Sequence, residues 1–262
     1  MRSTAIFLVR CVSIACAWAI AGIALTSAAS TNVPVPVRLV ADRGDLVLSL
    51  SDGSTIHGAE LTGAVVTIAG TKAKIVGSRI DPEDPRGEIR LFDLRVDDSS
   101  FCARDPKGEH WAIAVSDDSQ PGGVGFTCTS GAVGKCIRFG YAPWRTAPDG
   151  KTALAPYHAA CTNLVRAAYG GPDRAWTRDG MAIDVYDDLG IQTPDTVGGD
   201  RFEAGFGPDG AVCVAHPRVR EIGSLDDIVA AAPHLADRIG PHACTEEIAR
   251  RSGALVFVRS AP

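Results

Sequence analysis

The chain has 262 residues, of which 45% are hydrophobic and 22% are charged, and its formal net charge is -5 at pH 7. This composition is that of an ordinary globular protein, long enough for one large domain or two small ones. The acidic balance argues against nucleic acid and anionic membrane surfaces as partners, because these require a basic face.

The first 29 residues have the pattern of a signal peptide. Arg2 and Arg10 precede an apolar run at 11–25, about 15 residues long, which is shorter than the roughly 20 residues of a membrane span. Ser27 and Ala29 supply the small residues expected before a cleavage site after Ala29. We therefore expect a secreted or periplasmic (cell-envelope) protein that meets the membrane only through its leader. A retained N-terminal anchor is the alternative.

The next segment is predicted to be a linker followed by a β-rich domain. Residues 30–37 favour an extended linker, because valine and proline alternate from 33 to 37. From 38 to 98, short segments with strand-forming residues are separated by turn signals such as Asp52-Gly53. The expected strands are Asp45–Leu50, Ser54–Leu61, Ala64–Ala69, Ala73–Ser78 and Glu88–Val96. Strands this short and this closely spaced suggest a small sandwich or open barrel.

Residues 99–262 are predicted to form a cysteine-containing α+β domain. The expected elements are a strand at 110–115 in an otherwise irregular stretch from 99 to 130, a strand or short helix at 135–141, a helix at 156–169, a hairpin of 202–206 with 211–215, helices capped by Ser224 and Thr245, and a closing strand at 254–259. The fold class is therefore α+β, with a β-rich N-terminal half and about three short helices and hairpins in the C-terminal half.

The helix expected at 156–169 is the clearest element of the chain. Its apolar side chains recur with helical spacing, namely Tyr157, Ala160, Cys161, Leu164, Val165 and Ala168. Pro156 suits the first turn, and the Gly170-Gly171-Pro172 sequence is a typical helix stop. One face of this helix should be buried, with Cys161 pointing inward.

Removal of the leader leaves Cys102, Cys128, Cys136, Cys161, Cys213 and Cys244. An even number of cysteines in an exported chain indicates a disulfide framework. Six cysteines allow 15 pairings, and short spacing favours Cys102–Cys128, Cys136–Cys161 and Cys213–Cys244. The absence of a Cys-x-x-Cys pair argues against zinc-ribbon and thioredoxin-like sites.

An acidic segment from 178 to 188 contains the candidate site residues. Asp179 and Asp184, together with His158, could supply the acid and base of a hydrolase, or the carboxylates could bind calcium. The alternative is structural: Asp179 lies in a turn, and Asp184 forms an ion pair with Arg166 or Arg178 because it stands between apolar residues.

Other candidate motifs lack the required spacing. His158 lies one helical turn from Cys161, as in a Cys–His pair, but a disulfide is the simpler role for Cys161. The remaining histidines show no metal-ligand spacing, and no nucleophile elbow or phosphate loop is present. We expect no metal and no cofactor.

Three stretches resemble the bacterial ADYC-domain family: residues 166–170 with 177–187, residues 128–144 and residues 206–218. The likeness covers roughly 90–215. Ala168, Gly170 and Met181 replace the Asp, Cys and Thr of the family pattern, so one carboxylate and one sulfur are missing. The resemblance implies a secreted or envelope protein and implies no activity.

The sequence as a whole favours a non-enzymatic structural or partner-binding module, because it shows no catalytic motif. Its partner would be an unknown protein or small molecule. The alternative is an exported hydrolase that uses Asp179, Asp184 and His158.

Overall fold

The computed structural model describes residues 33–105, 107–117, 119, 123–195 and 200–261. The predicted signal peptide and residues 30–32 of the predicted linker lie outside these residues, and the end of that linker, from Pro36, belongs to the first strand. None of the described helices is long and apolar enough to cross a membrane.

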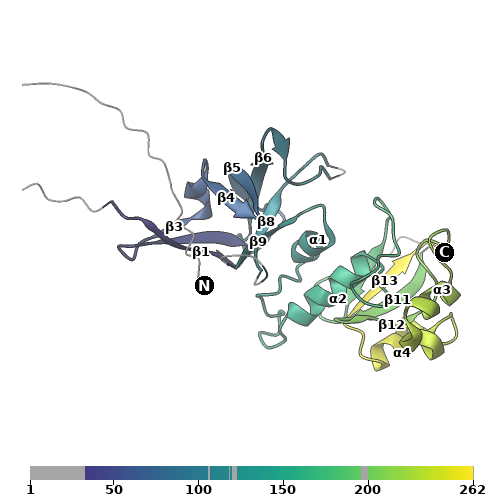
Figure 1. Cartoon of the computed structure of the whole chain (residues 1–262). Coiled ribbons are helices and arrows are strands. Elements are labelled where there is room, and N and C mark those ends of the chain that lie inside the picture. Colours follow the sequence, from purple (N-terminus) through teal and green to yellow (C-terminus); the bar gives the residue numbers. More distant parts are fainter. Residues whose placement is uncertain (1–32, 106, 118, 120–122, 196–199, 262) are drawn as a thin grey trace, which may run out of the picture. The chain divides into compact units, whose positions relative to one another are not determined.

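Two antiparallel sheets occupy the N-terminal half (Figure 1). The first has the order β1-β2-β3 and consists of β1 (Pro36–Asp42), β2 (Asp45–Leu50) and β3 (Thr55–His57). The second has the order β4-β5-β6-β8-β9, with β7 paired to β6, and consists of β4 (Val65–Ile68), β5 (Thr71–Ile80), β6 (Arg90–Val96), β7 (Ser99–Ser100), β8 (Ala112–Ser116) and β9 (Val124–Cys128). This second sheet contains strands from both sides of residue 98.

Strand β6 packs against the protein on both sides near its start. Phe92 and Leu94 pack toward the first sheet, against Leu46. Leu91, on the opposite side of β6, packs with Ile137 of α1 (Ala132–Arg138). That side also carries Asp93 and Arg95, which form a salt bridge at 3.0 Å, so only its Leu91 end joins the core.

The C-terminal half is built on a third antiparallel sheet with the order β10-β13-β11-β12. Its elements are α2 (Ala155–Val165), β10 (Asp184–Asp187), β11 (Arg201–Gly207), β12 (Gly210–Val214), α3 (Leu225–Ala231), the 3-10 helix η2 (Pro233–Arg238), α4 (Glu246–Arg251) and β13 (Val256–Ser260). Figure 1 shows α2 and α4 beside this sheet, and both helices contact β11.

Alternation along β13 places α2 and α4 on opposite faces of the third sheet. Val256 and Val258 belong to the cluster that contains Leu164 of α2. Phe257, between them, belongs to a separate cluster with Ala249 of α4. Successive side chains of a strand point to opposite faces, so the sheet is covered on both sides.

The mixed α+β class is confirmed, while several element boundaries differ from those expected. Residues 54–61 form β3 and a 3-10 turn at Gly58–Leu61 instead of one strand. Of the two alternatives expected for 135–141, the short helix forms, but α1 begins at Ala132 and ends at Arg138. The stretch expected to be irregular contains β9.

The predicted helix at 156–169 ends at Val165, before the glycine pair. Arg166 is its C-cap, and Ala167 takes the left-handed conformation with φ 49°. An alanine thus provides the reversal that glycine usually supplies. The expected burial of Cys161 is confirmed, since this residue is fully buried.

The three disulfides are those favoured by spacing: Cys102–Cys128, Cys136–Cys161 and Cys213–Cys244. The second joins α1 to α2, and the third joins β12 to the segment before α4. Such a framework is consistent with an extracellular or otherwise oxidising compartment.

Candidate functional site

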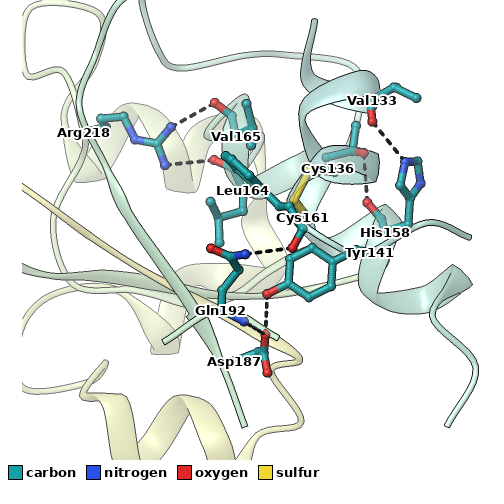
Figure 2. Close-up of a disulfide and its surroundings, with 12 residues drawn as sticks. Val133, Cys136, Tyr141, His158, Cys161, Leu164, Val165, Asp187, Gln192 and Arg218 are labelled. Atoms are coloured by element: carbon teal, nitrogen blue, oxygen red, sulfur yellow. Dashed lines mark hydrogen bonds between the residues drawn. A yellow bond between two sulfur atoms is a disulfide. The ribbon is translucent and has the colours of Figure 1, made fainter. Parts of the chain in front are cut away.

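The C-terminal end of α2 rests on a buried arginine. Arg218 donates from its guanidinium to the carbonyls of Leu164 at 2.8 Å and Val165 at 3.0 Å (Figure 2). These carbonyls lie in the last turn of the helix, where intrahelical partners are missing and the macrodipole favours a positive charge. Arg218 therefore caps the helix that ends directly before the family-like stretch at 166–170.

The charge of Arg218 is balanced by Glu203 of β11. Their side chains form two hydrogen bonds, Nε to Oε2 at 2.9 Å and a terminal nitrogen to Oε1 at 3.0 Å. The exposed fractions are 1% for Arg218 and 0% for Glu203. A buried ion pair survives only when its remaining hydrogen-bonding capacity is filled, and the helix carbonyls fill that of Arg218.

Tyr169 completes this network. Its hydroxyl donates to Glu203 Oε1 at 2.9 Å and accepts from the Arg218 backbone N–H at 2.9 Å. Burial, followed by the nearby Glu203 carboxylate, raises the pKa of Tyr169 well above its usual value. The phenol therefore stays protonated at neutral pH and acts as a hydrogen-bond donor within the fold.

A second buried network surrounds Asp187 at the end of β10. Its carboxylate accepts hydrogen bonds from the Tyr141 hydroxyl at 2.5 Å and from the backbone N–H groups of Leu189 at 2.5 Å and Gln192 at 2.8 Å (Figure 2). Burial and this carboxylate raise the pKa of Tyr141. Asp187 thus closes the turn after β10 and has no position left for a substrate.

The Cys136–Cys161 disulfide lies between α1 and α2, near His158 (Figure 2). His158 Nε2 is 3.2 Å from the carbonyl oxygen of Val133. A carbonyl only accepts hydrogen bonds, so this nitrogen carries the proton. Burial lowers the pKa of His158, which makes it a neutral link between two helices.

Asp184 is buried as expected, but it pairs with a different arginine. Its Oδ2 is 3.7 Å from Arg259, and its Oδ1 accepts from the Asp195 N–H at 3.0 Å. The cause is strand pairing, because Asp184 and Arg259 stand directly opposite each other on β10 and β13. The predicted pair with Arg166 or Arg178 is therefore wrong, and Arg178 instead lies 3.9 Å from Glu221.

The three candidate catalytic residues have separate surroundings. His158 contacts α1, Asp184 contacts β13, and Asp179 is exposed in a turn. In the part of the chain that the structure describes, no hydrogen bond or ion pair joins any two of them. The same residues contain no group of three or more His, Cys, Asp or Glu side chains that could hold a metal ion.

Sequence reasoning missed Glu203, Arg218 and Tyr141. Glu203 does leave a signal, because a charged residue between Phe202 and Ala204 in an apolar strand requires a buried partner. Arg218 leaves none, since an arginine after a proline is usually a surface residue.

Of the three positions where the chain departs from the family pattern, Ala168 is internal, whereas Gly170 and Met181 are exposed. Ala168 is fully buried. A Cβ added to Gly170 would lie 2.8 Å from Cβ of Ala232, closer than real Cβ contacts come. A cysteine at position 170 would thus need the backbone near Ala232 to move. The departures at Ala168 and Gly170 therefore bear on packing, and the one at Met181 lies at the surface.

Two further ion pairs attach the loop between β5 and β6 to the segments around α1. Arg145 donates to both oxygens of Asp84 at 2.8 Å, and Arg138 donates to Asp81 Oδ2 at 2.8 Å. Asp81 and Asp84 each have 1% of their side-chain surface exposed. We assign both pairs a structural role, because each buried carboxylate is bonded to an arginine of the same chain and is not turned toward solvent.

Comparison with known proteins gives one family. Residues 53–220 match the family model described as the ADYC domain. No curated protein and no solved structure matches the chain.

Proposed function

The chain belongs to the ADYC domain family, and from this premise we propose that it acts as an exported, non-enzymatic module with a structural or partner-binding role. The observation that carries the proposal is the internal use of Tyr169 and Asp187, two polar residues of the family-like stretches. Tyr169 and Asp187 both direct their oxygens into the fold, where protein donors and acceptors satisfy them. A catalytic group, by contrast, must have access to a substrate.

Export rests on two separate supports. The N-terminal pattern is that of a cleaved leader, and all six cysteines outside the leader are in disulfides. Disulfides persist in oxidising compartments and are rare in the cytosol. The mature protein is thus proposed to be secreted or to reside in the periplasm or cell envelope.

The export part is tested by expressing the full chain in a bacterial host and determining the N-terminus of the recovered protein by mass spectrometry. A mature chain that begins at Ser30 in the periplasm or medium is the expected result. Membrane-bound protein that retains Met1 would overturn it.

The non-enzymatic part is tested with the purified mature protein and panels of ester, phosphate, peptide and glycoside substrates. We expect no turnover. The proposal fails if a hydrolytic activity is found that His158→Gln or Asp184→Asn abolishes while the melting temperature stays unchanged. That result would establish the exported hydrolase instead.

A further inference from the structure

Four Asp-Gly pairs occur in the sequence: Asp52-Gly53, Asp149-Gly150, Asp179-Gly180 and Asp209-Gly210. An aspartyl side chain followed by glycine can undergo spontaneous isomerisation, because glycine leaves its backbone nitrogen sterically open. The reaction requires a free carboxyl group and a free backbone N–H that can approach each other. The structure therefore allows the four pairs to be ranked.

Two pairs have both reacting groups engaged. Asp52 accepts from the Ser54 hydroxyl at 2.6 Å and the Ser54 N–H at 2.9 Å, and the Gly53 N–H donates to the Leu50 carbonyl at 3.0 Å. Asp149 accepts from the Thr152 hydroxyl at 2.6 Å, and the Gly150 N–H donates to the Ala147 carbonyl at 2.9 Å. Ring closure at either pair must first break these bonds.

The third pair is constrained by its surroundings. Gly210 is buried at the start of β12, opposite Gly207 in the hairpin. A Cβ placed on it would lie 2.7 Å from both the Tyr169 carbonyl oxygen and the Gly171 nitrogen. The backbone of Gly210 cannot move toward Asp209 without displacing the chain beside the Tyr169 network.

Asp179-Gly180 shares its exposure and its positive glycine φ with the first two pairs but lacks their hydrogen bonds. Both residues are exposed, and Gly180 has φ 82°. Within the described ranges, neither the Asp179 carboxylate nor the Gly180 N–H makes a hydrogen bond. The segment before the turn is held at Trp176, whose backbone N–H donates to the Arg166 carbonyl at 3.1 Å.

We propose that Asp179-Gly180 is a site of spontaneous isoaspartate formation in the folded protein. The Gly180 nitrogen attacks Cγ of the protonated Asp179 carboxyl group, a C–N bond forms, and a C–O bond breaks with loss of one water. The resulting five-membered succinimide then takes up one water at either carbonyl. One product is aspartate, and the other is isoaspartate, in which the backbone runs through the former side chain.

The test is to age the purified, disulfide-bonded protein at neutral pH and a temperature below its melting point. Isoaspartate at each pair is then quantified by peptide mapping with electron-transfer fragmentation. We expect accumulation at position 179 to be several-fold faster than at positions 52 and 149. In denaturant the four rates should converge, because the restraints belong to the fold.

Matched variants test whether the isomerisation needs the aspartate side chain and whether local hydrogen bonds control its rate. Asp179→Glu should abolish isomerisation at 179, since a glutamate would have to close a larger ring, and Asp149→Glu should leave the rate at 179 unchanged. Ser54→Ala should raise the rate at 52 by removing the hydroxyl bond to its carboxylate, although the bond from the backbone N–H of residue 54 remains. The inference is overturned if position 179 reacts no faster than 52 and 149 in the native protein, or if its lead persists undiminished in the denatured chain.

Discussion

At the scale of single residues, three polar groups in or beside the family-like stretches serve as internal supports. Glu203, Arg218 and Tyr169 form one closed network with the end of α2, and none of the three reaches solvent. The low dielectric of the interior strengthens each contact and also raises the cost of leaving one partner unpaired. Removing a single member should therefore be costly.

Glu203→Gln leaves the Arg218 guanidinium buried without a counter-charge, so we expect a loss of about 3–5 kcal/mol in the free energy of unfolding. Urea denaturation of the oxidised protein measures it. The matched control is Glu247→Gln, which removes an exposed pair with Arg251 and should change stability by no more than ~0.5 kcal/mol. Equal effects of the two substitutions would contradict the structural role of the network.

Asp184 and Asp179 provide a second contrast between a buried and an exposed carboxylate. Asp184→Asn weakens the contact with Arg259 and should cost about 1–3 kcal/mol. Asp179→Glu, in an exposed turn, should stay within ~0.5 kcal/mol of the parent. Thermal melts of both variants decide this, and an unchanged melt for Asp184→Asn would show that its buried contacts contribute nothing to the fold.

At the scale of elements, the loop between β5 and β6 is held by arginines from the helical part of the chain. Burial alone would raise the pKa of Asp84, but hydrogen bonds from Arg145 and from the N–H groups of Ile89 and Glu88 outweigh it and lower the pKa to about 2. The ionised form is therefore favoured by folding. The ion pair of Asp84 with Arg145 thus attaches the loop before β6 to the segment after α1.

The pH dependence of unfolding tests this link. The pKa of Asp84 falls from 3.8 to about 2 on folding, so its stabilisation is present above about pH 4 and is lost as the pH falls through 2. The expected loss is on the order of 2 kcal/mol. Urea midpoints measured from pH 5 to pH 2 should fall less steeply for Asp84→Asn than for the parent, and parallel curves would contradict the assignment.

Local signals in the sequence predict the elements that local chemistry controls. Ser224 and Thr245 cap their helices as expected, each accepting a hydrogen bond from the N–H three residues on. The hairpin around Pro208 and Asp209 also forms. In these cases the deciding contacts lie within a few residues of each other.

Features set by distant contacts could not be predicted in this way. The partner of Asp184 depends on the pairing of β10 with β13, which nothing near residue 184 encodes. The early end of α2 depends on Ala167 adopting a left-handed conformation that alanine disfavours. The Arg218 network joins three segments that only the finished fold brings together.

At the scale of the whole molecule, Pro34–Pro262 forms one compact unit that three disulfides reinforce. Intact mass before and after reduction should differ by six hydrogens, because three bonds each take up two. Cys136→Ser with Cys161→Ser should lower stability by about 2–5 kcal/mol. A native thiol that reacts with an alkylating reagent would contradict complete pairing.

The order of the three disulfides along the chain has a consequence for biogenesis. Each of the six cysteines in the described residues bonds to its immediate neighbour in sequence, so the three covalent loops follow one another without overlap. A polypeptide that enters an oxidising compartment N-terminus first would present each correct partner before the next cysteine arrives. Oxidation in order of arrival then produces the native connectivity without reshuffling. We expect the yield of natively folded protein to depend on a thiol oxidase and to be insensitive to loss of a disulfide isomerase.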